Sequence, residues 1–151
     1  MIVQFDGGVP KDHISFEASD CNLSNAIVLL DLTGSAGGLS FDATPMDSDA
    51  KTPQPVEITS GYGALSNVRD GDMRLQILVH MLPPGEALKL SANLGDTPGQ
   101  ETTGAGAGSE ISGASIRVAL SDRVVKGTFD MAGTATISLP EDASVCMAAA
   151  N

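Results

Sequence analysis

The sequence has few aromatic side chains. It has no Trp, one Tyr and four Phe, so that aromatics make up 3% of its 151 residues. Aromatic and Arg side chains are the usual anchors of pockets and binding hot spots. A sugar-stacking platform or an aromatic-lined groove is therefore disfavoured. Hydrophobic residues still make up 42% of the chain, which predicts a core built from Val, Ile, Leu, Met and Ala.

Positive charge is also scarce. Eight Lys and Arg stand against 19 Asp and Glu, which gives a formal net charge of −11. A field of this sign repels phosphate backbones and anionic lipid surfaces. The basic residues are scattered along the sequence and form no basic run. We therefore expect neither nucleic acid nor a membrane as a partner.

Targeting segments are missing from the sequence given. The start, MIVQFDGGVPKD, has neither the basic beginning nor the apolar stretch of a signal peptide. No apolar run approaches the roughly 18 residues of a membrane-spanning helix. These features predict a cytoplasmic protein, or a component of a particle such as a virion that is assembled in the cytoplasm.

Only two cysteines are present, Cys21 and Cys146, near opposite ends of the chain. Spacing alone leaves open whether they are two thiols or one disulfide. Free Cys is usually buried, which favours thiols. A disulfide would need an oxidising compartment, as in a pilus or adhesion subunit whose leader has been removed.

Motifs for catalysis and nucleotide binding are absent from the sequence. The glycines at Gly104, Gly106 and Gly108 satisfy neither GxGxxG nor GxxxxGK[ST], and no GxSxG is present. The two histidines, His13 and His80, have no Cys or second His at a metal-ligand spacing. The sequence therefore predicts a protein that is not an enzyme, without a zinc site and without a bound cofactor.

Two carboxylate pairs are the candidate metal ligands. They are Asp47 with Asp49 and Asp70 with Asp72, each pair in a turn-like segment. Ca²⁺ binds several oxygens from flexible acidic loops, so these four residues are candidate Ca²⁺ ligands. Neither pair continues into the EF-hand pattern, and Asp is also common in turns because it bonds its own backbone. Turn formation is the alternative explanation.

The arrangement of apolar residues predicts β-strands. They recur at every second position in short runs broken by Gly, Pro, Asp and Asn, and 17 Gly and eight Pro indicate many turns. We expect a single all-β domain over residues 1–151, a β-sandwich or jelly-roll-like domain of about ten short strands, with a small barrel as a third possibility. Long Gly/Pro-rich flexible loops are expected near 44–55 and 95–113. The expected strands are 2–5, 14–18, 25–32, 39–42, 56–59, 74–81, 88–94, 116–120, 125–131, 135–139 and 144–148.

Some strand pairings are also predicted. Strands 74–81 and 88–94 are expected to form a hairpin across Pro83–Glu86. The strands at 116–120, 125–131 and 135–139 are expected to form a meander, and 25–32 is expected to pair with 39–42. Met81 and Met131 fall on the phase of their strands that is expected to face the core.

Together these features favour a structural role. A small acidic all-β domain with long loops and no catalytic motif suits a repeated subunit that its neighbours clasp. The leading hypothesis is a capsid decoration or cement protein of a virus or phage, a homo-oligomer such as a trimer on a protein lattice. A Ca²⁺- or ligand-binding β-sandwich module is one alternative, and a pilus or adhesion subunit is another.

Overall fold

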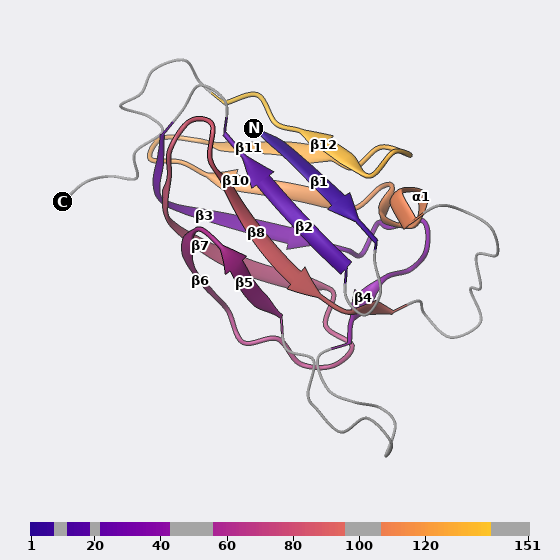
Figure 1. The fold of residues 1–151 in the computed structure, drawn as a ribbon. Helices are drawn as coiled ribbons and strands as arrows, with labels where there is room; N and C mark the ends of the chain where they lie inside the picture. Colours follow the sequence, from indigo (N-terminus) through magenta and orange to yellow (C-terminus); the bar gives the residue numbers. More distant parts are fainter. Residues whose placement is uncertain (8–11, 19–21, 43–55, 96–106, 140–151) are drawn as a thin grey trace.

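The computed structural model describes residues 1–7, 12–18, 22–42, 56–95 and 107–139 (Figure 1). The described chain is almost entirely β-structure, which confirms the prediction of an all-β domain. The strands are β1 (Ile2–Asp6), β2 (Asp12–Glu17), β3 (Leu23–Asp31), β4 (Ser40–Phe41), β5 (Glu57–Ser60), β6 (Tyr62–Leu65), β7 (Arg74–Leu82), β8 (Ala87–Ala92), β9 (Leu94–Gly95), β10 (Ser115–Ala119), β11 (Val124–Thr128) and β12 (Thr134–Thr136). A short helix, α1 (Ala107–Ile111), precedes β10.

The strands form two five-stranded antiparallel sheets. Sheet A has the order β12-β1-β2-β8-β5, and sheet B has the order β11-β10-β3-β7-β6. The two-residue strands β4 and β9 form a separate small pair. Figure 1 looks onto sheet A, with sheet B behind it. The chain passes directly between the sheets at β2 to β3, β5 to β6, β7 to β8 and β11 to β12, and changes sheet again from β3 to β5 and from β8 to β10. The fold is therefore a β-sandwich.

The inner faces of the two sheets form one hydrophobic core. Side chains of a strand alternate between its two sides, so every second apolar residue faces the opposite sheet. Burial of a Val, Leu, Ile or Phe side chain stabilises the fold by roughly 1.5–3 kcal/mol. Sheet A contributes Val3, Phe5, Ile14, Phe16, Leu88 and Leu90, and sheet B contributes Val28, Leu30, Leu75, Ile77, Val79, Ile116 and Val118.

The predicted hairpin across Pro83–Glu86 is wrong. Residues 74–82 do form a strand, but β7 lies in sheet B and β8 lies in sheet A, where its partners are β2 and β5. The Pro-Pro-Gly turn carries the chain over the core from one sheet to the other. Alternation identifies a strand with one buried face but does not say in which sheet the strand lies.

Two other predicted pairings are also corrected. The C-terminal meander holds only for β10 and β11, which are paired, because β12 crosses to sheet A and pairs with β1. The segment at 39–42 does not pair with β3, since β4 pairs with β9. The strand β3 lies instead between β10 and β7 at the centre of sheet B.

The predicted burial of two methionines is wrong. Met81 is 45% exposed and Met131 is 72% exposed. In β7, His80 and Met81 are both exposed and Leu82 takes the buried position. Asn25 of β3 has a φ of 55° and lies, like His80 of β7, between the paired positions Ser24–Met81 and Ala26–Val79. The alternation therefore changes phase at this point in both strands. Met131 lies in the turn between β11 and β12.

Two elements in the described residues were not predicted, β6 and α1. The helix falls within the range 95–113 that was expected to be a loop, and Gly95 belongs to β9. Residues 43–55 and 96–106, and the strand expected at 144–148, lie outside the described residues, as do Cys21 and Cys146. No helix in the described part of the chain is long and apolar enough to cross a membrane.

A close contact between two glycines joins the turn after α1 to the turn after β3. The backbone of this turn after β3 donates hydrogen bonds to the α1 segment, from Ala36 N to Ser112 O (2.8 Å) and from Gly37 N to Glu110 O (2.9 Å). A Cβ on Gly34 would lie 2.7 Å from the Gly113 carbonyl oxygen, and a Cβ on Gly113 would collide with the Gly34 carbonyl oxygen. Gly113 also has a φ of 92°, which favours glycine.

Gly113→Ala is expected to lower the free energy of unfolding by about 2–4 kcal/mol, because the substitution adds both backbone strain and a collision with backbone. Gly85→Ala is the matched control. Gly85 also has a positive φ, of 82°, but a Cβ there would meet no atom within 4 Å, so a loss of only about 1 kcal/mol is expected. Chemical denaturation of both variants measures the difference, and equal losses would contradict the collision.

Candidate functional site

The structure places one of the two predicted carboxylate pairs. Asp70 and Asp72 lie in the loop between β6 and β7, on either side of Gly71. The Asp72 carboxylate accepts a hydrogen bond from Arg69 N (2.8 Å), and the Asp72 backbone N donates to Arg69 O (3.0 Å). Asp72 thus closes a turn, as the alternative explanation expected. Asp47 and Asp49 lie outside the described residues.

Asp70 lies beside a carboxylate that sequence reasoning missed, Asp42. The loop containing Asp70 docks on β4 through backbone hydrogen bonds, from Gly71 N to Phe41 O (2.8 Å) and from Phe41 N to Asp72 O (2.7 Å). The Asn93 amide donates to Asp42 Oδ2 (3.2 Å). Asp42 Oδ1 is buried and accepts no hydrogen bond from the described residues.

The surroundings of Asp42 disfavour its charged form. Burial raises the pKa of the Asp42 carboxyl, and the neighbouring Asp70 carboxylate raises it further. A shared proton or a bound cation can relieve the repulsion between two such close carboxylates. Among the described residues, however, no group of three or more His, Cys, Asp or Glu side chains could hold a metal ion.

The two histidines lie on different sheets and do not form a common site. His13 is on β2 of sheet A and His80 is on β7 of sheet B. His13 lines a shallow hollow of about 440 Å³ on sheet A together with Asp6, Ser15 and Lys89. A second hollow of about 630 Å³, lined by Thr59, Tyr62 and Glu86 among others, lies next to it on β5 and β8.

The solvent face of sheet B carries a row of apolar residues that crosses all five strands. Register pairs Val124 with Ala119, Ala119 with Ile27, Ile27 with Leu78, and Leu78 with Ala64. Directly opposite residues in a sheet point to the same side, so these five residues form one line, the apolar row. It spans four inter-strand spacings, about 19 Å. Val124 is 64% exposed and Ile27 is 41% exposed.

A signal for the apolar row was present in the sequence. The run Ala26 to Leu30 is apolar without alternation, and Leu78 is the apolar member of the otherwise polar side of β7. Such a continuous run fits a strand buried on both faces. In this chain the second face of β3 is open to solvent, with Ile27 exposed and Leu29 partly buried.

Two cations lie beside the apolar row. Arg117 and Lys126 are directly opposite each other on β10 and β11, two residues along from Ala119 and Val124. Both side chains are exposed, and neither forms an ion pair with the described residues. Like charges directly opposite are destabilising in a sheet. The β10–β11 hairpin therefore places two cations side by side, in a chain with an excess of carboxylates.

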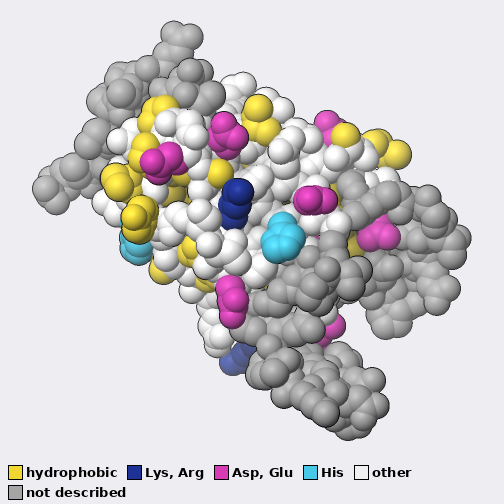
Figure 2. Space-filling model, in the orientation of Figure 1, with side chains coloured by type: hydrophobic (Ala, Val, Ile, Leu, Met, Phe, Trp, Pro, Cys, Tyr) yellow, Lys and Arg dark blue, Asp and Glu magenta, His cyan; other side chains and the backbone are white. Residues whose placement is uncertain are grey.

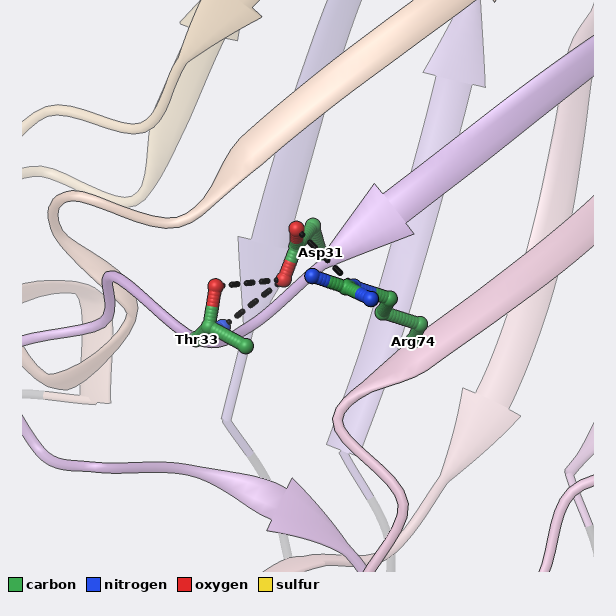
Figure 3. A network of polar contacts seen from close by, with 3 residues as sticks. All are labelled: Asp31, Thr33 and Arg74. Carbon is green, nitrogen blue, oxygen red and sulfur yellow. Dashed lines mark hydrogen bonds and ion pairs between the residues drawn. The ribbon is translucent and has the colours of Figure 1, made fainter.

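A third cation on this face, Arg74, is paired. Its Nε lies 3.3 Å from Asp31 Oδ2, while Asp31 Oδ1 accepts hydrogen bonds from Thr33 N (3.0 Å) and Thr33 Oγ1 (2.7 Å) (Figure 3). The network fixes the turn at the end of β3. Burial acts to raise the pKa of Asp31, but the Thr33 hydrogen bonds and the Arg74 guanidinium outweigh it and leave this pKa below its ordinary value.

Comparison with models of known protein families, with curated protein sequences and with solved structures found no match to this chain.

Asp31→Asn is expected to lower the free energy of unfolding by about 1 kcal/mol at neutral pH, because the charge-assisted bonds are weakened. Because the pKa of Asp31 is lower in the folded than in the unfolded state, the carboxylate stabilises the fold at pH values above its ordinary pKa of about 4. This contribution is lost as the pH falls through the lowered pKa of the folded state. The difference between wild type and variant should therefore shrink below about pH 4. Urea denaturation at pH 7 and pH 3 measures it.

Asp122→Asn is the control for this experiment. The Asp122–Arg123 pair is exposed on both sides, and exposed pairs contribute little, so a smaller difference is expected. A difference for Asp31→Asn that is equal at both pH values would show that the carboxylate charge is not what stabilises the turn.

Proposed function

We propose that this protein is a non-enzymatic structural subunit that joins other protein subunits through the solvent face of sheet B. The apolar row is the observation that carries the proposal. Five apolar residues in one line on a regular sheet face form a contiguous patch, and such patches mark protein contact surfaces. The sheet beneath holds the row in one fixed shape through its backbone hydrogen bonds. Few side chains would therefore have to lose conformational freedom when a partner docks there.

The setting proposed for the subunit is the surface of a larger assembly. A decoration or cement subunit on a virus or phage capsid is the leading possibility, as a homo-oligomer such as a trimer on the capsid lattice. The support for this setting is an argument from general architecture, because a small acidic β-sandwich with a preformed contact face suits a repeated subunit. A surface filament, such as a pilus or adhesion fibre, is the other setting in which such a subunit would serve.

The native mass of the protein across a dilution series, measured by light scattering, tests the structural role. The mass is expected to rise above that of one chain at high concentration. The double variant Ile27→Ser with Val124→Ser should weaken association about tenfold, since loss of two apolar side chains from the contact costs about 1–2 kcal/mol.

Met131→Ser is the matched control. Met131 is also apolar and exposed but lies in the turn between β11 and β12, away from the apolar row, so association should not change. A wild-type mass that stays at one chain over the whole series counts against the proposal, and equal weakening by both variants counts against the apolar row.

A second candidate function is Ca²⁺ binding by a β-sandwich module. The observation that favours it is Asp42 Oδ1, which is buried beside the Asp70 carboxylate and accepts no hydrogen bond from the described residues. Ca²⁺ takes six to eight oxygens, so further ligands would come from outside the described residues, where Asp47 and Asp49 lie. The cation would then offset the repulsion between Asp42 and Asp70.

Thermal unfolding with Ca²⁺ and with chelator tests the second candidate. At 100 times its dissociation constant, Ca²⁺ should stabilise the wild type by about 2.7 kcal/mol. In chelator, Asp70→Asn should be more stable than the wild type, because a like charge is removed, and Ca²⁺ should no longer stabilise it. Asp6→Asn, an exposed carboxylate on sheet A, is the control. An unchanged wild-type melting temperature in Ca²⁺ and in chelator would rule the site out.

A further inference from the structure

The charges on the two solvent faces of the sandwich are complementary. The solvent face of sheet B has a formal charge of +2, from the three cations Arg74, Arg117 and Lys126 and the one carboxylate Asp31. The solvent face of sheet A has a formal charge of −2, from three exposed carboxylates and the one cation Lys89. The three carboxylates are Asp6, Glu17 and Glu57.

The carboxylates of sheet A are spread over its face and available to a partner. Register places Asp6 opposite His13 and Glu17 opposite Ile2, and Glu57 opposite Ser91. None of the three forms an ion pair with the described residues. Figure 2, which looks onto sheet A, shows acidic side chains distributed across this side of the molecule.

We infer that the partner of the sheet B face is the sheet A face of a second copy of this chain. This inference rests on the proposed structural function and names its partner. The uncompensated pair of Arg117 and Lys126 is destabilising within one chain and becomes favourable when carboxylates of another copy face it. Two identical sheet B faces would instead bring these cations against each other, so a symmetric contact through sheet B is disfavoured.

The two faces lie on opposite sides of one sandwich, so the contact joins unlike surfaces. A contact of this kind is heterologous and repeats from copy to copy. Because opposite faces of a sandwich point in opposite directions, the copies stack in line, and a ring of three is not expected. Of the two settings proposed above for the subunit, this contact favours the filament over a trimer on a capsid lattice.

Each single contact is expected to be weak. The apolar row is about 19 Å long, and one sheet face of this size offers less than the roughly 800 Å² per partner of a standard interface. Stacking should therefore appear only at high protein concentration, and it should be reversible on dilution. The net charge of −11 adds a repulsion that salt screens.

Charge reversal on one face at a time tests the inference. The sheet B variant is Arg117→Glu with Lys126→Glu, which changes that face from +2 to −2. The sheet A variant is Glu17→Lys with Glu57→Lys, which changes that face from −2 to +2. All four positions are exposed, and circular dichroism and melting curves confirm that both variants fold.

Sedimentation equilibrium of each variant and of their equimolar mixture gives the result. Each variant alone carries two faces of the same sign and should associate at least tenfold more weakly than the wild type. The mixture restores opposite charges at every contact, so association at the wild-type level is expected again. Arg69→Glu is the control, because it changes the net charge of the protein at a position in the loop before β7, outside both sheet faces. It should leave association nearly unchanged.

The possible outcomes separate the inference from the proposed function. If the wild type associates and the sheet A variant associates equally well, the partner of sheet B is not sheet A, and the inference is overturned while the structural role stands. If both variants are weakened but the mixture is not restored, the charges do not face each other and the inference fails as well. A wild type that stays a single chain at every concentration overturns both.

Discussion

Burial of one face of each sheet against the other is the interaction on which the rest of this structure depends. The strands of the two five-stranded sheets present an apolar side inward, because the core between the sheets excludes water, and all four Phe of the chain lie in that core. That requirement fixes which residues point outward. The residues available for function are those whose side chains point outward from the sheets. They include the apolar row and the Asp31–Arg74 pair.

The sequence predicts the strands better than it predicts their partners. Period-two alternation identified β1, β2, β7, β8 and β10 because each has one buried and one solvent-exposed side. The pairing of β7 with β8 failed, since the Pro83–Glu86 turn leads across the core as readily as it would turn back in one sheet. Pairing between distant segments, such as β1 with β12, cannot be predicted from the alternation of apolar residues within each strand.

The candidate site was only partly visible in the sequence for the same reason. Asp70 was identified from its turn, but its neighbour Asp42 is 28 positions earlier and is brought to it by backbone bonds between the loop and Phe41. The apolar row takes one residue from each of five strands. Its members become a surface only when the register of all five strands is known.

The outermost strands of the sandwich limit how the protein can associate. A long, flat edge strand exposes unpaired backbone groups to other chains and invites fibrous aggregation. Of the four edge strands, β5 and β6 are four residues long with ladders interrupted by irregular register, β12 has three residues and β11 has five. Such edges are poor templates for backbone pairing. Side chains on the faces, rather than the backbone, are left to govern contact between copies, which keeps that contact reversible and selective.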